Sequence, residues 1–146
     1  MAAFISHSPA ETGSLGERWG RAAQRGLVIG LSGDLGAGKT QLVKGIARGL
    51  GITARVHSPT FMLVNEYGGG RLRLFHLDLY RLETRGQIVS AGLEEFLQPD
   101  GVTVIEWAER WIHCGLRISD CGLFKQAKIV VAGESERKII YDDFGA

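Results

Sequence analysis

Several absences from the sequence exclude whole classes of protein. Its 146 residues hold no apolar run of about 18 residues or more, which excludes an ordinary membrane-spanning helix. The two cysteines, Cys114 and Cys121, are too few for a disulfide scaffold, and their spacing is not that of zinc ligands. We therefore expect two reduced thiols and no membrane partner.

An excess of basic charge is also missing. The chain has 17 Lys and Arg against 16 Asp and Glu, a net charge of +1. A protein that binds nucleic acid on its own usually has a strong excess of basic residues. We expect no DNA partner. The N-terminus lacks a basic segment followed by an apolar stretch, so we expect a cytoplasmic protein rather than a secreted one.

The composition that is present is ordinary apart from its glycine. Hydrophobic residues make up 45% of the chain and charged residues 23%, as in soluble globular proteins, and the length favours a single domain over residues 1–146. Glycine accounts for 21 residues, about twice its usual share of roughly 7%. Because the glycines follow no collagen period, we expect them in turns and close backbone approaches.

Hydrophobic patterning predicts strands and helices that alternate at first and then give way mostly to strands. Ser8, Pro9 and Glu11 predict a helix that begins with a capping box and stops at Gly26. Strands are expected at residues 2–7, 27–32, 60–67, 71–79, 102–106, 127–132 and 137–141. Further helical segments are expected at 39–50, at 108–113 and, most weakly, at 83–97, where Gly86 and Gly92 should interrupt the helix. This order predicts an α/β fold, a three-layer sandwich with a mixed, mostly central sheet.

The segment Gly33-Asp34-Leu35-Gly36-Ala37-Gly38-Lys39-Thr40 fits the Walker A pattern G-x-x-x-x-G-K-[ST]. Its glycines allow the backbone to curl so that successive amides face phosphate oxygens, and the following helix adds a partial positive charge. Lys39 is expected to reach the β- and γ-phosphates of a nucleotide, and the Thr40 hydroxyl to bind Mg²⁺. Residues 33–40 together with Gln41 form the predicted nucleotide site, with ATP as substrate. With this motif the predicted three-layer sandwich is P-loop NTPase-like.

Two acids complete the predicted site. Glu106 ends an apolar strand, where ligands bind in such sheets, and Asp78 lies near the end of another. We expect Lys39, Asp78 and Glu106 to be catalytic, and Thr40 and Glu106 to hold Mg²⁺. The alternatives are a solvated strand end for Glu106 and, for Asp78, a structural partner of Arg81 or of a backbone donor. Which acid positions water and which supports the metal stays open.

Three further features surround this predicted site. Ser58-Pro59-Thr60 precedes a strand and could sense the γ-phosphate as a switch loop, or could be a plain turn. Trp107 could contact nucleotide or a partner, or be a core aromatic. His76 is expected to be packed or hydrogen-bonded rather than a metal ligand, and Glu109 and Arg110 to form a solvated helical turn.

These motifs together resemble one family. The segments are G-D-L-G-A-G-K-T at 33–40, S-P-T-F at 58–61, N-E-Y at 65–67, H-L-D-L-Y-R-L at 76–82, G-L-E-E at 92–95 and I-E-W at 105–107. In this order they resemble the TsaE family, bacterial ATPases of tRNA threonylcarbamoyladenosine biosynthesis, over residues 5–112. The resemblance implies a partner-stimulated ATPase that works with the proteins TsaD and TsaB and meets tRNA indirectly. The modified adenosine lies beside the anticodon of tRNAs that read codons beginning with A.

The resemblance also assigns residues and shows departures. It matches Thr40, Asp78 and Glu106 to magnesium binding and hydrolysis, and residues 58–60 to a switch-like loop. Ala108 stands where the family usually has proline, and residues 83–91 and 113–125 match poorly or not at all.

Two other functions are compatible with a P-loop. A small-molecule kinase could use Asp78 as base and Arg81 and Arg85 as a lid, and a nucleotide-dependent binding module would need no turnover. A GTPase is disfavoured because the N-K-x-D motif is missing, and an ABC transporter subunit because L-S-G-G-Q is missing.

Overall fold

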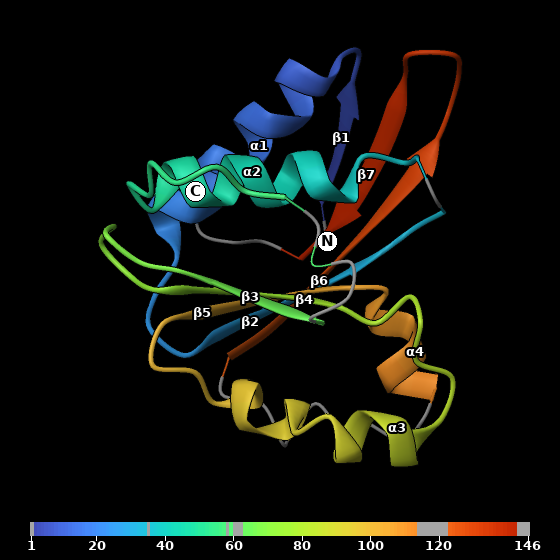
Figure 1. Ribbon diagram of the computed structural model, residues 1–146. Helices are drawn as coiled ribbons and strands as arrows, with labels where there is room; N and C mark the ends of the chain where they lie inside the picture. Colours follow the sequence, from blue (N-terminus) through green and yellow to red (C-terminus); the bar gives the residue numbers. More distant parts are fainter. Residues whose placement is uncertain (1, 35, 58, 60–62, 114–122, 143–146) are drawn as a thin grey trace.

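A computed structural model describes residues 2–34, 36–57, 59, 63–113 and 123–142. The chain forms a seven-stranded sheet in the order β1-β7-β6-β2-β5-β4-β3, with helices on both faces (Figure 1). The strands are β1 (Ala2–Ser6), β2 (Leu27–Ser32), β3 (Val64–Tyr67), β4 (Leu74–Asp78), β5 (Val102–Glu106), β6 (Leu123–Val131) and β7 (Arg137–Tyr141). The helices are α1 (Pro9–Ala22), α2 (Lys39–Gly49), α3 (Arg85–Ser90), the 3₁₀ helix η1 (Leu93–Leu97) and α4 (Ala108–His113).

The sheet is mixed, as the sequence predicts. Strand β2 lies between β5 and β6 and is parallel to both, and β4 is parallel to β5. The outer pairs are antiparallel: β3 with β4, β6 with β7, and β7 with β1. The register sets Glu106 beside Leu31 on one neighbouring strand and beside Asp78 on the other, so both predicted acids lie at the same edge of the sheet.

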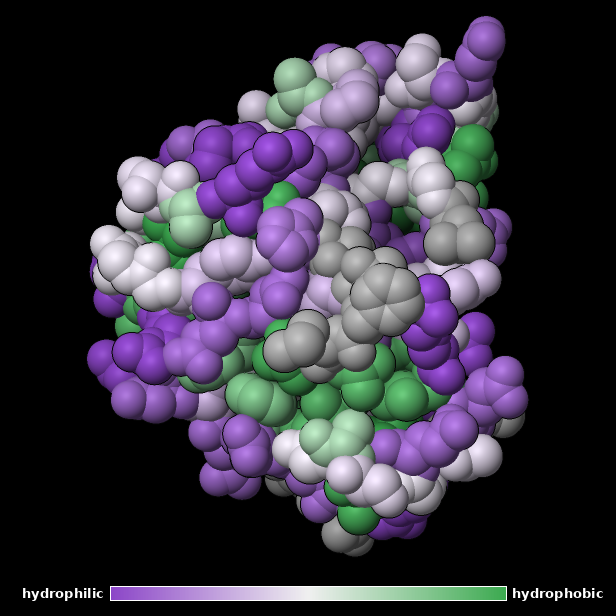
Figure 2. All heavy atoms as spheres, in the orientation of Figure 1, coloured by the Kyte–Doolittle hydropathy of each residue, from purple (hydrophilic) through white to green (hydrophobic). Residues whose placement is uncertain are grey.

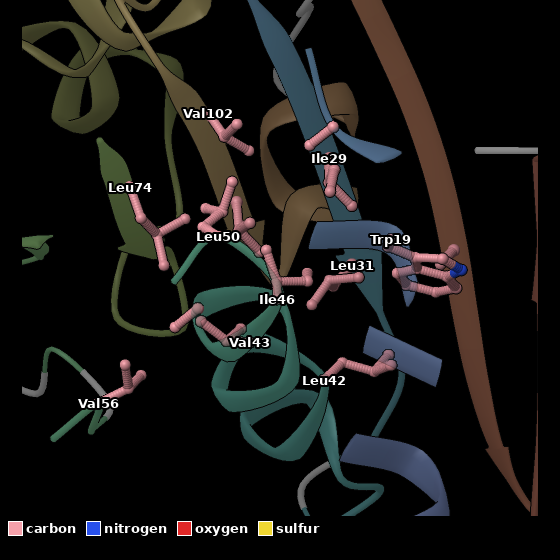
Figure 3. Close-up of a cluster of buried hydrophobic side chains, with 14 of the residues drawn as sticks. Trp19, Ile29, Leu31, Leu42, Val43, Ile46, Leu50, Val56, Leu74 and Val102 are labelled. Atoms are coloured by element: carbon pink, nitrogen blue, oxygen red, sulfur yellow. The ribbon is translucent and has the colours of Figure 1, made fainter. Parts of the chain in front are cut away.

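Side chains alternate between two cores on the two faces of the sheet. Helices α1 and α2 cover one face, and α3, η1 and α4 cover the other (Figure 1). On the first face, apolar residues of α2 point toward those of the central strands (Figure 3), and they include Leu42, Val43, Ile46, Leu50, Ile29, Leu31, Leu74 and Val102. The space-filling view shows mostly hydrophilic residues over α2 and hydrophobic surface between the sheet and α3 (Figure 2).

Several predicted boundaries need correction. Strand β6 begins at residue 123 rather than 127, because its first residues pair with β2. The helical stretch predicted over 83–97 is interrupted at Gly92 as expected, since a φ of 72° ends α3 before η1 begins, but the interruption expected at Gly86 is wrong, because α3 runs through it. The Ser8 hydroxyl caps α1 as expected, but the Glu11 carboxylate accepts from the amide of His7 rather than from that of Ser8.

The remaining predicted elements agree with the structure to within a few residues where the structure describes them. Strand β4 is shorter than predicted, and β3 begins at Val64, with residues 60–62 of its predicted range outside the described residues. The two strands form the expected hairpin around the glycines at 68–70. Cys114 and Cys121 lie outside the described residues. Among the described residues, the helices are all too short or too polar to traverse a lipid bilayer.

Candidate functional site

The loop at residues 33–40 joins the end of β2 to the first turn of α2. Gly33 (φ 140°) and Gly38 (φ 103°) hold conformations that residues with a side chain rarely adopt. A Cβ on Gly33 would also lie 2.5 Å from the backbone oxygen of Ile129 in β6. Residues 36–41 line a pocket of about 500 Å³, so the loop and the N-terminus of α2 face one hollow, an arrangement suited to anions.

Lys39 lies inside this loop and is 5% exposed. The side chain donates from Nζ to the carbonyl oxygens of Gly33 (2.5 Å) and Asp34 (2.9 Å). The same Nζ lies 4.1 Å from the centre of the Trp107 ring, within the range of a cation–π contact. Burial lowers the pKa of Lys39, while nearby carboxylates, Glu106 first among them, act in the opposite direction.

The side chains of Glu106 and Thr40 lie next to each other in the pocket wall. Glu106 ends β5 and is 3% exposed, and the Thr40 hydroxyl lies 3.3 Å from each of its carboxylate oxygens. Asp78 lies beside Glu106 in register and lines the same pocket. Burial raises the pKa of Asp78, and the charge of Glu106 adds to this shift, although the Tyr80 amide donates to Asp78 Oδ1 at 2.9 Å.

A hydroxyl and a carboxylate are donors that Mg²⁺ accepts. The described residues hold no cluster of three or more His, Cys, Asp or Glu side chains suited to a metal ion. Mg²⁺ needs no such cage, because it is usually bound by one or two carboxylates, by substrate phosphates and by water. The facing oxygens of Thr40 and Glu106 therefore fit magnesium held jointly with a polyphosphate.

Trp107 occupies a special backbone position next to these acids. Its φ of 60° places it in the left-handed region, which is uncommon for a residue with a side chain. Its half-buried ring lines the pocket and lies 5.0 Å from the Tyr80 ring, centre to centre. The Arg110 guanidinium lies 5.6 Å from the Trp107 ring centre. The structure thus places Trp107 beside the phosphate loop, neither wholly in the core nor free in solvent.

The prediction of a solvated helical turn at Glu109 and Arg110 is confirmed for the helix, because both residues lie in α4, and is wrong for the solvation of Arg110. Arg110 is half-buried beside the rings of Tyr80 and Trp107 and donates to the backbone oxygen of Leu82 at 3.3 Å. Glu109 is exposed, yet it accepts a long bond of 3.4 Å from the amide of Gly33. Charge alone suggested solvent for both side chains, but α4 holds Arg110 beside these rings and Glu109 beside the phosphate loop.

Sequence patterns missed one wall of the pocket. The start of α1 and the turn between β6 and β7 contribute Ser8, Pro9, Thr12, Glu134, Ser135 and Arg137. Arg137 also donates to the Gly36 carbonyl at 3.4 Å. These residues belong to no sequence motif. They reach the loop because β1 pairs with β7, so only a correct prediction of this pairing could have identified them.

Part of the predicted site is not placed. Leu35 of the phosphate loop and Ser58 and Thr60 of the predicted switch loop lie outside the described residues. Pro59 is buried and is not among the described residues that line the pocket. The switch role of this loop stays a prediction.

The parallel strands, the loop between β2 and α2 and the acid at the end of β5 define an α/β protein of the P-loop NTPase-like class. Comparison with known proteins narrows this class. The chain belongs to the TsaE family, because the family model "Threonylcarbamoyl adenosine biosynthesis protein TsaE" matches residues 6–139.

Individual relatives agree with the family match. A Bacillus subtilis (strain 168) protein named tRNA threonylcarbamoyladenosine biosynthesis protein TsaE is 39% identical over 140 residues, covering 94% of this chain and 83% of the relative. An Aquifex aeolicus protein of the same name is 34% identical over 92% of this chain and 91% of its own length. A Synechocystis relative is 48% identical, over 64% of each chain.

A solved structure supports the fold. The crystal structure of Bacillus subtilis YdiB superposes with a TM-score of 0.77 at 33% identity, covering 99% of this chain and 86% of that chain.

Proposed function

We propose that this protein is a magnesium-dependent ATPase that serves the biosynthesis of threonylcarbamoyladenosine in tRNA. Family membership and the names of the relatives support the pathway. The observation that carries the ATPase assignment is the facing pair of Thr40 and Glu106 beside Lys39 in one pocket. This arrangement matches what phosphoryl transfer to water requires, namely positioned phosphates and neutralised charge.

Each described residue has a role in this proposal. The amides of residues 36–41 and the ammonium of Lys39 bind the polyphosphate, for which Lys39 exchanges its carbonyl contacts at Gly33 and Asp34 for phosphate oxygens. Thr40 and Glu106 would hold magnesium, which when bound supplies neutralisation of the phosphate charge.

Asp78 and Glu106 polarise the attacking water. A carboxylate whose pKa is raised by burial is a better proton acceptor near neutral pH than an ordinary aspartate. The geometry favours Asp78 for this task, because Thr40 contacts both carboxylate oxygens of Glu106 and His76 is bonded to one of them, whereas the Tyr80 amide donates to Oδ1 of Asp78.

The proposal includes partners. We infer that the ATPase acts with the TsaD and TsaB proteins of the threonylcarbamoyl transferase system, and that tRNA is contacted through them. The net charge of +1 supports indirect contact, because phosphate-driven affinity requires a basic surface.

A phosphate-release assay tests the ATPase assignment. We expect magnesium-dependent release of free phosphate from ATP, increased by the candidate partners, and a loss of about 100-fold or more in Lys39→Ala, because the main cation at the phosphates is removed. Lys44→Ala is the matched control, since Lys44 lies on the same helix and does not line the pocket. Unchanged turnover in Lys39→Ala would refute the proposal, and phosphate appearing on an acceptor would indicate a kinase instead.

A further inference from the structure

His76 lies directly behind Glu106, beneath the pocket. It sits on β4 two residues before Asp78, so both side chains project from the same face of the sheet. The imidazole is 0% exposed, and its Nε2 is hydrogen-bonded to Oε2 of Glu106. Since Thr40 contacts the same carboxylate from the pocket, Glu106 is held from two sides.

The hydrogen-bond partners of the imidazole indicate which ring nitrogen carries the hydrogen. A carboxylate accepts hydrogen bonds, so Nε2 must carry the hydrogen that it shares with Glu106. The other ring nitrogen, Nδ1, is buried and has no hydrogen-bond partner among the described residues. A hydrogen on Nδ1 would therefore be a buried donor with nothing to accept it, and such donors are costly. The favoured form has hydrogen on Nε2 and a bare Nδ1.

We propose that His76 is a positioning residue for Glu106. Its Nε2–H fixes one carboxylate oxygen of Glu106, which leaves the group correctly turned toward Thr40 and the pocket. The inference rests on the proposed ATPase function for its kinetic consequence. His76 is not among the described residues that line the pocket, so it acts on the nucleotide only through Glu106.

The positioning of Glu106 by His76 predicts a specific kinetic pattern. Removing the Nε2–H lets the Glu106 carboxylate rotate, which weakens metal binding and lowers turnover, whereas the amides and Lys39 that bind phosphate are untouched. Groups that orient metal ligands from behind typically contribute about 10- to 100-fold in metal affinity or activity. The effect should therefore fall on kcat and on the magnesium requirement, with little change in KM for ATP.

The first test compares His76→Leu, which removes the hydrogen bond, with His76→Gln, which retains an N–H donor. We expect His76→Leu to lower kcat or raise the half-saturating magnesium concentration about 10- to 100-fold, and His76→Gln to recover most of the loss. Thr103→Val is the matched control, because it removes a buried hydrogen bond from β5, that of the Thr103 hydroxyl to the Phe96 carbonyl. Wild-type kinetics in His76→Leu, or no rescue by glutamine, would overturn the inference.

The second test needs neither nucleotide nor magnesium. Nitrogen-15 NMR of the histidine rings, with His76 assigned by loss of its signals in His76→Gln, should show hydrogen on Nε2 and a bare Nδ1. Glu106→Gln should move the Nε2 signal. Hydrogen on Nδ1, or no response to Glu106→Gln, would overturn the inference even if His76→Leu fails to fold. If wild-type protein hydrolyses no ATP while this pattern holds, the ATPase proposal fails and the hydrogen bond stands.

Discussion

Two titratable side chains in the pocket share one physical circumstance. Burial lowers the pKa of Lys39 and raises the pKa of Asp78, so burial opposes the charged form of each group. A bound polyphosphate would stabilise the charged form of Lys39, and a divalent cation would stabilise the charged form of Asp78, as water does for exposed side chains. These two buried charges therefore lower the stability of the folded protein, while they suit the pocket to charged ligands. Such perturbed groups are common at functional sites.

Asp78 allows a test of how a buried charge in the pocket affects the stability of the protein. Its pKa in the folded protein lies above the ordinary value of 3.8, so ionised Asp78 lowers the stability of the native state at any pH above the raised pKa. That penalty shrinks as pH falls through the raised pKa and is gone below about 3.8. We expect Asp78→Asn to melt at a higher temperature than wild type at pH 7, with the difference vanishing in acid, and to lose most ATP hydrolysis.

Thermal melts of both proteins across pH, alongside phosphate release at pH 7, measure the two effects. Glu94→Gln is a suitable control, because Glu94 is an exposed carboxylate on η1 and does not line the pocket. A lower melting temperature for Asp78→Asn at pH 7 would show that the Tyr80 amide bond outweighs the burial of the charge.

Helices α1 and α2 approach so closely that only glycine fits at their contact. A Cβ on Gly45 would lie 2.0 Å from the Gly13 carbonyl oxygen, and one on Gly16 would lie 2.4 Å from the Leu42 carbonyl oxygen. The contact has consequences for the site, because α2 begins at Lys39 and the first residues of α1 line the pocket. The unusual glycine content of the sequence is thus partly explained by helix packing.

We expect Gly45→Ala to destabilise the protein by about 1–3 kcal/mol, since the methyl group forces two backbones apart. This cost exceeds the gain of about 0.5–1 kcal/mol that alanine usually brings to a helix. Gly86→Ala is the matched control: Gly86 lies in α3, and the nearest atom to an added Cβ is 3.9 Å away. Urea unfolding of both variants measures the difference, and equal stabilities would contradict the close contact.

Element prediction from the sequence succeeded where one local signal was sufficient. The apolar runs at 27–32 and 102–106 match β2 and β5, because strands buried on both faces need no partner to be recognised. The start of β6 was missed because Phe124 and Gln126 show no alternation of their own and become strand by pairing with β2. The glycine signal correctly predicts the break at Gly92, but it wrongly predicts one at Gly86, which lies inside α3.

At the scale of the whole molecule, the sequence located the phosphate loop and the two acids but not the wall opposite them. Motif reasoning works along the chain, whereas this wall depends on β7 lying between β1 and β6. That arrangement brings the β6–β7 turn to the phosphate loop, about a hundred residues away in sequence. No local pattern in the C-terminal hairpin distinguishes it from an ordinary surface hairpin.

Arg137 allows a test of the contribution that the C-terminal hairpin makes to the pocket. Its guanidinium donates to the carbonyls of Gly133, Glu136 and Gly36 and lines the pocket, so it is held where a bound polyphosphate would meet a second cation besides Lys39. We expect Arg137→Gln to weaken ATP binding about 10-fold, the size of one charge-assisted hydrogen bond.

Calorimetric titration with ATP and magnesium measures this change, and the neighbouring residue supplies the control. Lys138 is exposed and projects from the opposite face of β7, so Lys138→Gln removes the same charge without touching the pocket. An equal loss in both variants would mean that the overall charge of the hairpin matters rather than the position of Arg137. A loss confined to Arg137→Gln would mean that the position of Arg137, which β7 holds between β1 and β6, contributes to ATP binding.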